Sequence, residues 1–257
     1  MQIKILVAVS FLLLSPKPSS AAIMKIKDLG TASAASGTSV SITVPAGGVA
    51  AGHTVIFAFI TNPAYGGLVE DTRGNAYNVD GQGGGNPNGN LTIYSATITT
   101  PLQAGDHVTL TISAAVSIVA SATEFSGLAV APHDQVTAWA GSTSAVNSGN
   151  VTTTVASELL VGVVKTVGAS TSFTPGSGYA ALGGGSVPFA MGSSFTLIPE
   201  FRIISSTGTY VADGTLGGDQ AWFAFIVTYK AYDCTADTQG PGVTAPTAVV
   251  VAQSRCQ

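Results

Sequence analysis

The chain has 257 residues, of which 46% are hydrophobic and only 9% are charged, and its formal net charge is −4. An ordinary soluble domain carries about 25% charged residues, so the surface of this protein must consist mainly of Ser, Thr, Asn, Gln and Gly. Sparse Lys and Arg argue against nucleic acid as a partner and against a basic membrane-binding patch, because both need clustered positive charge.

The first 22 residues have the three-part pattern of a secretory signal. Lys4 supplies the positive start, Ile5–Leu14 is an apolar run, and Ser19–Ala22 offers small residues for cleavage. Because a membrane-spanning helix needs about 20 apolar residues, we predict a cleaved signal and no membrane span afterwards. The protein is then secreted, extracellular or at the cell surface. An uncleaved N-terminal anchor is the alternative.

Short runs of β-branched or alternating residues, bounded by turn residues, predict strands along the first half of the mature chain. The run TVIFAFIT is apolar almost throughout, which predicts a central strand. The expected strands are Ser39–Pro45, Thr54–Thr61, Ala76–Val79, Leu91–Thr99, His107–Ser113 and Val116–Phe125.

The second half repeats this order weakly, at an offset of about 102 to 113 residues. The expected strands are Val151–Val155, Ser157–Val167, Pro175–Leu182, Phe201–Val211 and Ala221–Lys230. A constant order over two copies predicts an all-β, jelly-roll-like β-sandwich built from two weakly repeated halves.

The predicted domain spans residues 23–231, with halves at about 30–130 and 145–231 and a surface crossing at His133–Asn150. Two small sandwiches in tandem are the alternative. Residues 232–257 form a linker-like tail with one apolar run, Val249–Val251. Cys234 and Cys256 could bridge in an exported protein, but spacing alone leaves their pairing open.

Four short segments carry a resemblance to a known group of proteins: DTRGNAY at Asp71–Tyr77, EFSG at Glu124–Gly127, ELLVG at Glu158–Gly162 and TGTY at Thr207–Tyr210. Together they resemble secreted prokaryotic β-sandwich modules that occur beside immunoglobulin-like or fibronectin-like repeats in cell-surface proteins. The resemblance covers roughly residues 30–231 and implies a surface-associated β-sandwich. It brings no active site with it.

Hydrolytic chemistry has little support in the sequence. No nucleophile elbow is present, although the fold could assemble a Ser–His–Asp arrangement around a histidine such as His133. A glycosidase needs two carboxyl groups, for which Glu124 and Glu200 are the candidates. Arg202 lies two residues from Glu200, so we expect an ion pair between strands there rather than catalysis. Whether the protein is an enzyme stays open, with a non-catalytic role favoured.

Two kinds of binding site have candidates. Asp71, Asn75 and Asp80 place oxygen atoms around one turn, a pattern that suits calcium, although Asp and Asn are also ordinary turn residues. For sugars, exposed aromatic rings beside polar loops are favourable, and Trp139, Tyr65 and Tyr94 are the candidates. The competing interpretation is that Trp139 only caps one end of the core.

The composition and these candidates favour a secreted, non-catalytic β-sandwich module for cell-surface adhesion or binding of a polysaccharide or surface glycan. The first alternative is a self-assembling filament or surface-layer subunit, because few charged residues protect strand edges from pairing. The donor strand would be Ile23–Ala35 or Val249–Val251. The second alternative is an extracellular polymer hydrolase.

Overall fold

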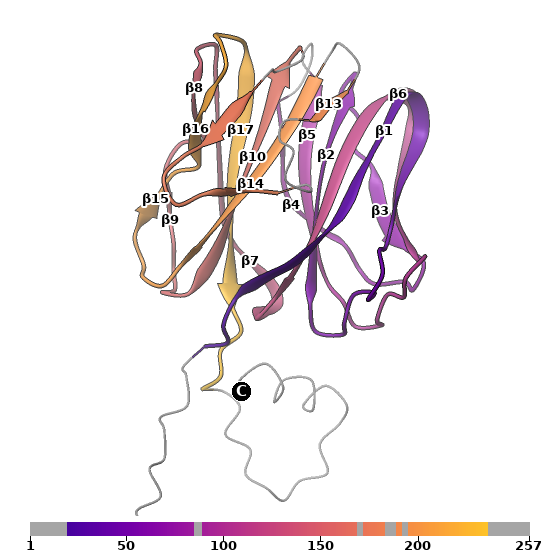
Figure 1. Ribbon diagram of the computed structural model, residues 1–257, viewed down its shortest axis with the longest axis vertical. Coiled ribbons are helices and arrows are strands. Elements are labelled where there is room, and N and C mark those ends of the chain that lie inside the picture. Colours follow the sequence, from indigo (N-terminus) through magenta and orange to yellow (C-terminus); the bar gives the residue numbers. More distant parts are fainter. Residues whose placement is uncertain (1–19, 85–88, 169–171, 183–188, 192–194, 236–257) are drawn as a thin grey trace, which may run out of the picture.

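The computed structural model describes residues 20–84, 89–168, 172–182, 189–191 and 195–235. Within these ranges the protein is all-β, with strands in antiparallel sheets and no helix (Figure 1). Accordingly, no helix in the described ranges has the length and apolar character needed to cross a membrane. Most of the predicted signal segment lies outside the described residues, as do Val249–Val251 and Cys256.

Two large antiparallel sheets, here called the main sheets, form the centre of the molecule. The first has the strand order β1 (Met24–Thr43), β6 (His107–Ser126), β2 (Thr54–Asn62), β5 (Asn90–Thr97) and β4 (Asn78–Gly83), with β3 (Leu68–Asp71) also paired to β6. The second has the order β7 (Leu128–Gly141), β17 (Trp222–Ala231), β10 (Glu158–Val167), β14 (Phe195–Ile204) and β12 (Ala180–Ala181), with β13 (Phe189–Met191) also paired to β14.

The main sheets pack face to face through one apolar core, called the central core below. Ile56, Ala58 and Ile60 of β2 reach it from the first sheet, and Val161 and Val163 of β10 reach it from the second. Side chains alternate along a strand, so the remaining residues of β2 and β10 must face the opposite side of their sheets. Both strands are nevertheless buried along almost their whole length, which is possible only if each main sheet is covered on both faces.

Specific contacts join the main sheets in addition to apolar burial. The rings of Phe125 and Phe201 meet edge to face at 5.6 Å. Tyr229 donates its phenolic O–H to the Asp80 carboxylate at 2.8 Å across the interface. A β-carbon added at Gly83 would lie 2.9 Å from the Phe223 ring, so the backbone of β4 approaches the second sheet as closely as only glycine allows.

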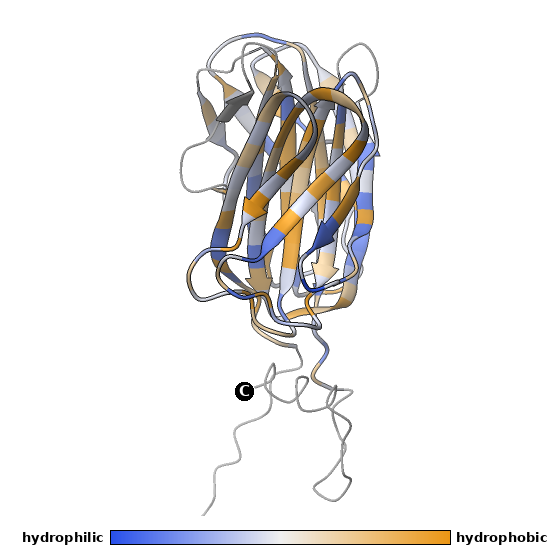
Figure 2. Ribbon diagram, turned by 90° about the vertical axis from the view of Figure 1, so that its right-hand side faces the viewer, coloured by the Kyte–Doolittle hydropathy of each residue, from blue (hydrophilic) through white to orange (hydrophobic). Residues whose placement is uncertain are grey.

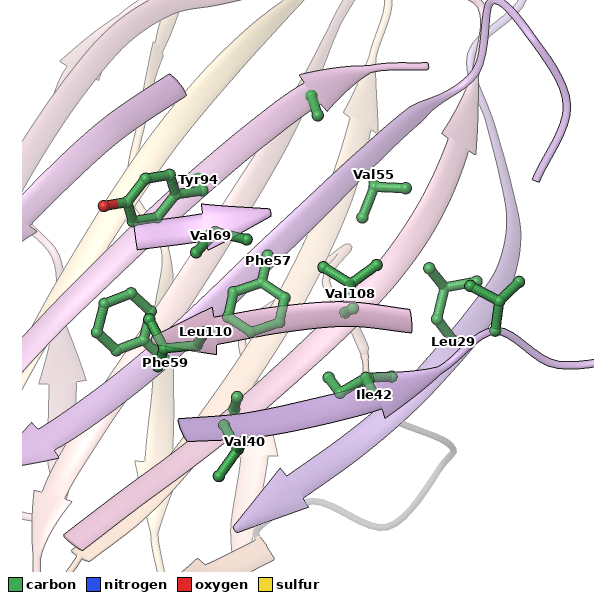
Figure 3. Packing of buried hydrophobic residues seen from close by; sticks show 14 of the residues in the cluster. Leu29, Val40, Ile42, Val55, Phe57, Phe59, Val69, Tyr94, Val108 and Leu110 are labelled. Carbon is green, nitrogen blue, oxygen red and sulfur yellow. The ribbon is translucent and has the colours of Figure 1, made fainter. Parts of the chain in front are cut away.

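A small outer layer covers the first main sheet. The second part of β1, the first part of β6 and the strand β3 form this layer, since β1 and β6 are long enough to serve both layers. Val69 of β3 and Leu110 of β6 pack onto Phe57 and Phe59 of β2 (Figure 3). In Figure 2 hydrophobic colours dominate the inner strands, whereas the outer strands alternate.

The second main sheet is covered in a similar way, by a three-stranded sheet and a two-stranded ribbon. The three-stranded sheet has the order β11 (Phe173–Pro175), β16 (Asp213–Leu216) and β8 (Ala145–Asn147), and the ribbon pairs β15 (Thr209–Tyr210) with β9 (Val151–Thr152). Phe173 and Leu216 pack with Val164 of β10, while Val151 packs with Leu160. The molecule is therefore a sandwich with an additional layer on each outer face.

Several expected elements differ from the structure. The two strands predicted around residues 107–125 are one continuous strand, β6. The predicted surface crossing at His133–Asn150 is wrong, because most of it belongs to β7 and β8. That segment has few β-branched residues, and it becomes a strand because the edge of β17 offers it a hydrogen-bonding partner.

The segment Ile23–Ala35, expected as a donor strand for a neighbour, is instead paired with β6 of its own chain from Met24 onward. At the same end of the molecule, Ser20 bridges Asp233, and Ala21 N donates to the carbonyl of Tyr232 at 2.8 Å. The first and last described residues therefore lie side by side. Cys234 is buried there and is part of a disulfide.

Because residues of both halves form the central core, we expect the two halves to unfold together. Replacing Phe225, which is 4% exposed and lies in that core, with Ala should lower the free energy of unfolding by about 3–5 kcal/mol, because it leaves a cavity. Val130→Ala, at a residue that is 69% exposed, is the control and should change it by less than about 0.5 kcal/mol. Urea unfolding followed by tryptophan fluorescence and far-UV circular dichroism measures both. Two separate transitions, with only one shifted by Phe225→Ala, would contradict the shared core.

Candidate functional site

The outer layer of the first half presents a regular polar surface. In this layer Val40, Ile42, Val108 and Leu110 point inward to the core, so the residues between them point to solvent. Strand pairing aligns these outward residues in rows across β1, β6 and β3. The rows are Ser39–Thr111–Leu68, Ser41–Thr109–Glu70 and Thr43–His107, the last of these ending at the turn residue Thr72.

A groove of about 330 Å³ lies on this surface. Its lining residues are Ser41, Glu70, Asp71, Thr72, His107 and Thr109. Within the rows, the hydroxyls of Ser41 and Thr109 lie 2.8 Å apart, and the Thr43 hydroxyl lies 3.3 Å from Nδ1 of His107. The groove thus combines hydroxyls, which both donate and accept hydrogen bonds, with an imidazole and the exposed carboxylate of Glu70.

The structure separates the three residues predicted to bind calcium. Asp71 and Asn75 lie together, and the two Asp71 oxygens accept from N and Nδ2 of Asn75 at 3.1 and 2.9 Å. Oδ1 of Asn75 accepts from the backbone N–H groups of Thr99 and Thr100, each at 2.9 Å. Asp80 instead faces Tyr229 in the interface between the main sheets. Within the described ranges no group of three or more His, Cys, Asp or Glu residues is placed to hold a metal ion.

The three candidate sugar-binding aromatics lie in three different environments. Trp139 is 64% exposed on β7, which is an edge strand of the second main sheet. Tyr94 is buried, stacks on Phe59 at 6.0 Å and donates its O–H to the carbonyl of Gly67. Tyr65 is half-buried and packs on the apolar residues between the first main sheet and its outer layer. Of the three residues, only Trp139 is mostly exposed.

The candidate catalytic residues lie on three different strands, β6, β14 and β7. Glu124 lies on the first main sheet, where its carboxylate is 2.5 Å from Nδ1 of His53 and 3.4 Å from Nζ of Lys27. Glu200 lies on the second main sheet. His133 is exposed on β7, with its ring 6.4 Å from that of Tyr229. Glu124, Glu200 and His133 therefore lie on three different strands with different neighbours.

The expected ion pair between Glu200 and Arg202 is absent among the described residues. The guanidinium of Arg202 lies over the Tyr210 ring at 5.5 Å, and neither carboxyl oxygen of Glu200 has a hydrogen-bond partner there. Glu200 is fully buried over Gly162, where an added β-carbon would come within 2.8 Å of it. Burial, with the nearby charge of Asp213, raises the pKa of Glu200 from 4.5 to about 8.

A second cavity, of about 250 Å³, lies where the ends of β7, β10 and β17 meet the loop after β4. Lys165 lines it, and its ammonium donates to the carbonyls of Gly84 and Gly89 at 2.8 and 2.9 Å. Burial lowers the pKa of Lys165 to about 8. Because these carbonyls engage the ammonium, Lys165 holds Gly84 and Gly89 against the second sheet.

Sequence reasoning did not select Ser41, Glu70, His107 or Thr109 as a site. A signal for them exists in the runs SVSIT and HVTLT, whose alternation puts Ser, Thr and His on one face of each strand. What the sequence does not contain is the register that sets the two runs side by side.

The buried Glu200 carboxyl predicts a pH dependence of stability. Its pKa is raised in the folded state, so the stability it contributes is full below pH 4.5 and is lost as pH rises toward 8. Wild type should therefore lose on the order of a few kcal/mol relative to Glu200→Gln between pH 5 and pH 8. Urea unfolding of both proteins at each pH measures this. Glu70→Gln, at an exposed carboxyl, is the control, and parallel pH profiles for wild type and Glu200→Gln would contradict the prediction.

Comparisons with known proteins do not assign this chain to a family. A scan against protein-family models, a search of curated proteins and a search of solved structures each find no match to this chain.

Proposed function

We propose that the protein is a secreted, non-catalytic β-sandwich module that binds a polysaccharide or cell-surface glycan through the polar groove of its first half. The observation that carries this proposal is the ordered array of hydroxyls around Glu70 and His107. A sugar presents many hydroxyls at short intervals, and each needs a donor or an acceptor when it leaves water. The groove offers both kinds of group in fixed register.

The surroundings of the groove also suit a glycan. Leu68 is 58% exposed at the end of one row, where it can cover the apolar face of a sugar ring. Glu70 and Asp71 make this surface acidic, which favours neutral glycans or amino sugars over acidic ones. A binding role rather than catalysis is supported by the separation of Glu124, Glu200 and His133 described above.

We also propose that the two-half, jelly-roll-like organisation arose by duplication. Support comes from strand order, because β1–β6–β2–β5–β4 and β7–β17–β10–β14–β12 place successive strands of each half in corresponding positions. The outer strands β3 and β11 correspond in chain order, since β3 lies between β2 and β4 and β11 lies between β10 and β12. An experimental structure in which the halves fail to superpose strand for strand would contradict the duplication.

Binding to immobilised neutral and amino-sugar polysaccharides, followed by calorimetry with a bound oligosaccharide, tests the glycan proposal. Glu70→Ala and Thr109→Val should each weaken binding roughly tenfold, the loss expected from about 1–2 kcal/mol per hydrogen-bonding group. Thr209→Val is the matched control, because Thr209 forms a similar exposed hydroxyl pair with Thr152, at 3.1 Å, away from the groove.

Two outcomes would count against this proposal. Absence of binding across the whole panel would reject glycan binding. Binding that is lost in Trp139→Ala but unchanged in Glu70→Ala and Thr109→Val would move the site to β7 and reject the groove.

A further inference from the structure

The edges of the main sheets differ in how well they are protected from pairing with another chain. A free edge exposes backbone N–H and C=O groups, and proteins commonly block such edges with bulges, charged residues or very short strands. β1 has register shifts at four places along its pairing with β6 and carries Lys25, Lys27 and Asp28. β4 has a register shift and carries Asp80, and β12 is only two residues long.

The second part of β7 has none of these protections. β7 is an edge strand of the second main sheet, and within the described residues β17 is its one partner strand. Val136–Gly141 runs in unbroken register with Trp222–Val227, whereas the register shifts of this pair lie nearer the start of β7. The six residues, VTAWAG, include no charged side chain.

This segment also exposes apolar side chains. Trp139 is 64% exposed and Val136 is 40% exposed. Val136 lies against β4, since a β-carbon at Gly81 would be 3.2 Å from it. Trp139 points to the opposite face of the sheet, because Ala138 between them packs toward the central core.

We propose that Val136–Gly141 is a homotypic docking edge, which pairs antiparallel with the same segment of a second copy of this chain. Steric complementarity sets the register. With Ala138 opposite Ala138, Trp139 of each copy lies beside the small Thr137 of the other, and Val136 lies beside Ala140. Such cross-strand neighbours are about 4.5–5.5 Å apart at their β-carbons, close enough for the indole ring to cover the threonine.

Charge is compatible with a second copy as the occupant. In this register, no charged residue of either chain falls within the paired segment, so no like charges face each other. Asp134, the nearest charged residue, is already held by Lys230 at 2.9 Å in its own chain. The pairing would join the two second main sheets into one continuous sheet. It is independent of the glycan proposal, whose groove lies on the first half.

Sedimentation velocity of the purified protein over a wide concentration range tests the docking edge. Wild type should form a dimer reversibly, and Trp139→Lys should raise its dissociation constant by about tenfold or more, because it puts a charge on the edge. Val130→Lys is the matched control: Val130 is 69% exposed on the same strand but lies outside the paired segment. This variant should dimerise as wild type does.

A mixing experiment tests the register. Thr137→Glu and Trp139→Lys chains should form a heterodimer more tightly than either forms a homodimer, since the introduced carboxylate of one copy then faces the introduced ammonium of the other. Wild type that stays monomeric at all concentrations would overturn the proposal. So would equal weakening by Val130→Lys and Trp139→Lys, or a mixture that associates no better than its separate components.

Discussion

Burial of both faces of both main sheets is the constraint on which the rest of the structure depends. A single sandwich buries one face of each sheet and leaves the other to water. Here β2 and β10 are buried throughout, so an outer layer is required on each side of the central core. The long strands β1 and β6 satisfy this requirement in the first half by serving both layers, while separate short strands do so in the second.

This layering explains the unusual composition. With two apolar-faced sheets inside, much of the chain must be apolar, and the outward faces of the outer layers are left to Ser and Thr. Charges that do enter the interior have specific partners in some places, as with Lys165 and the carbonyls of Gly84 and Gly89. Glu200 has none among the described residues, and its burial, with the nearby charge of Asp213, raises its pKa to about 8. The same scarcity of charged residues leaves Ser and Thr hydroxyls on the outer surface. It also leaves the edge of β7 without charged side chains that would block pairing with another chain.

The fold class and the central strands could be predicted from the sequence, because TVIFAFIT and ELLVGVVKTV combine β-branched residues with an almost unbroken apolar pattern. β7 could not, since Leu128–Gly141 has weak strand propensity and forms only where β17 provides a partner. Residue pattern likewise placed Asp71 and Asn75 at a turn. It could not show that Asp80 faces Tyr229, 149 positions later in the chain, because register across sheets is a tertiary property.

Native-state hydrogen exchange of backbone amides is the most direct test of the double burial of the main sheets. Amides of β2 and β10 should exchange only through global unfolding and give the same opening free energy, because both strands adjoin the shared central core. Amides of the short ribbon β9–β15 should exchange through smaller, local openings. If the β10 amides had a clearly lower opening free energy than the β2 amides, β10 would open while β2 stays folded. The two halves would then open separately, which would contradict this account.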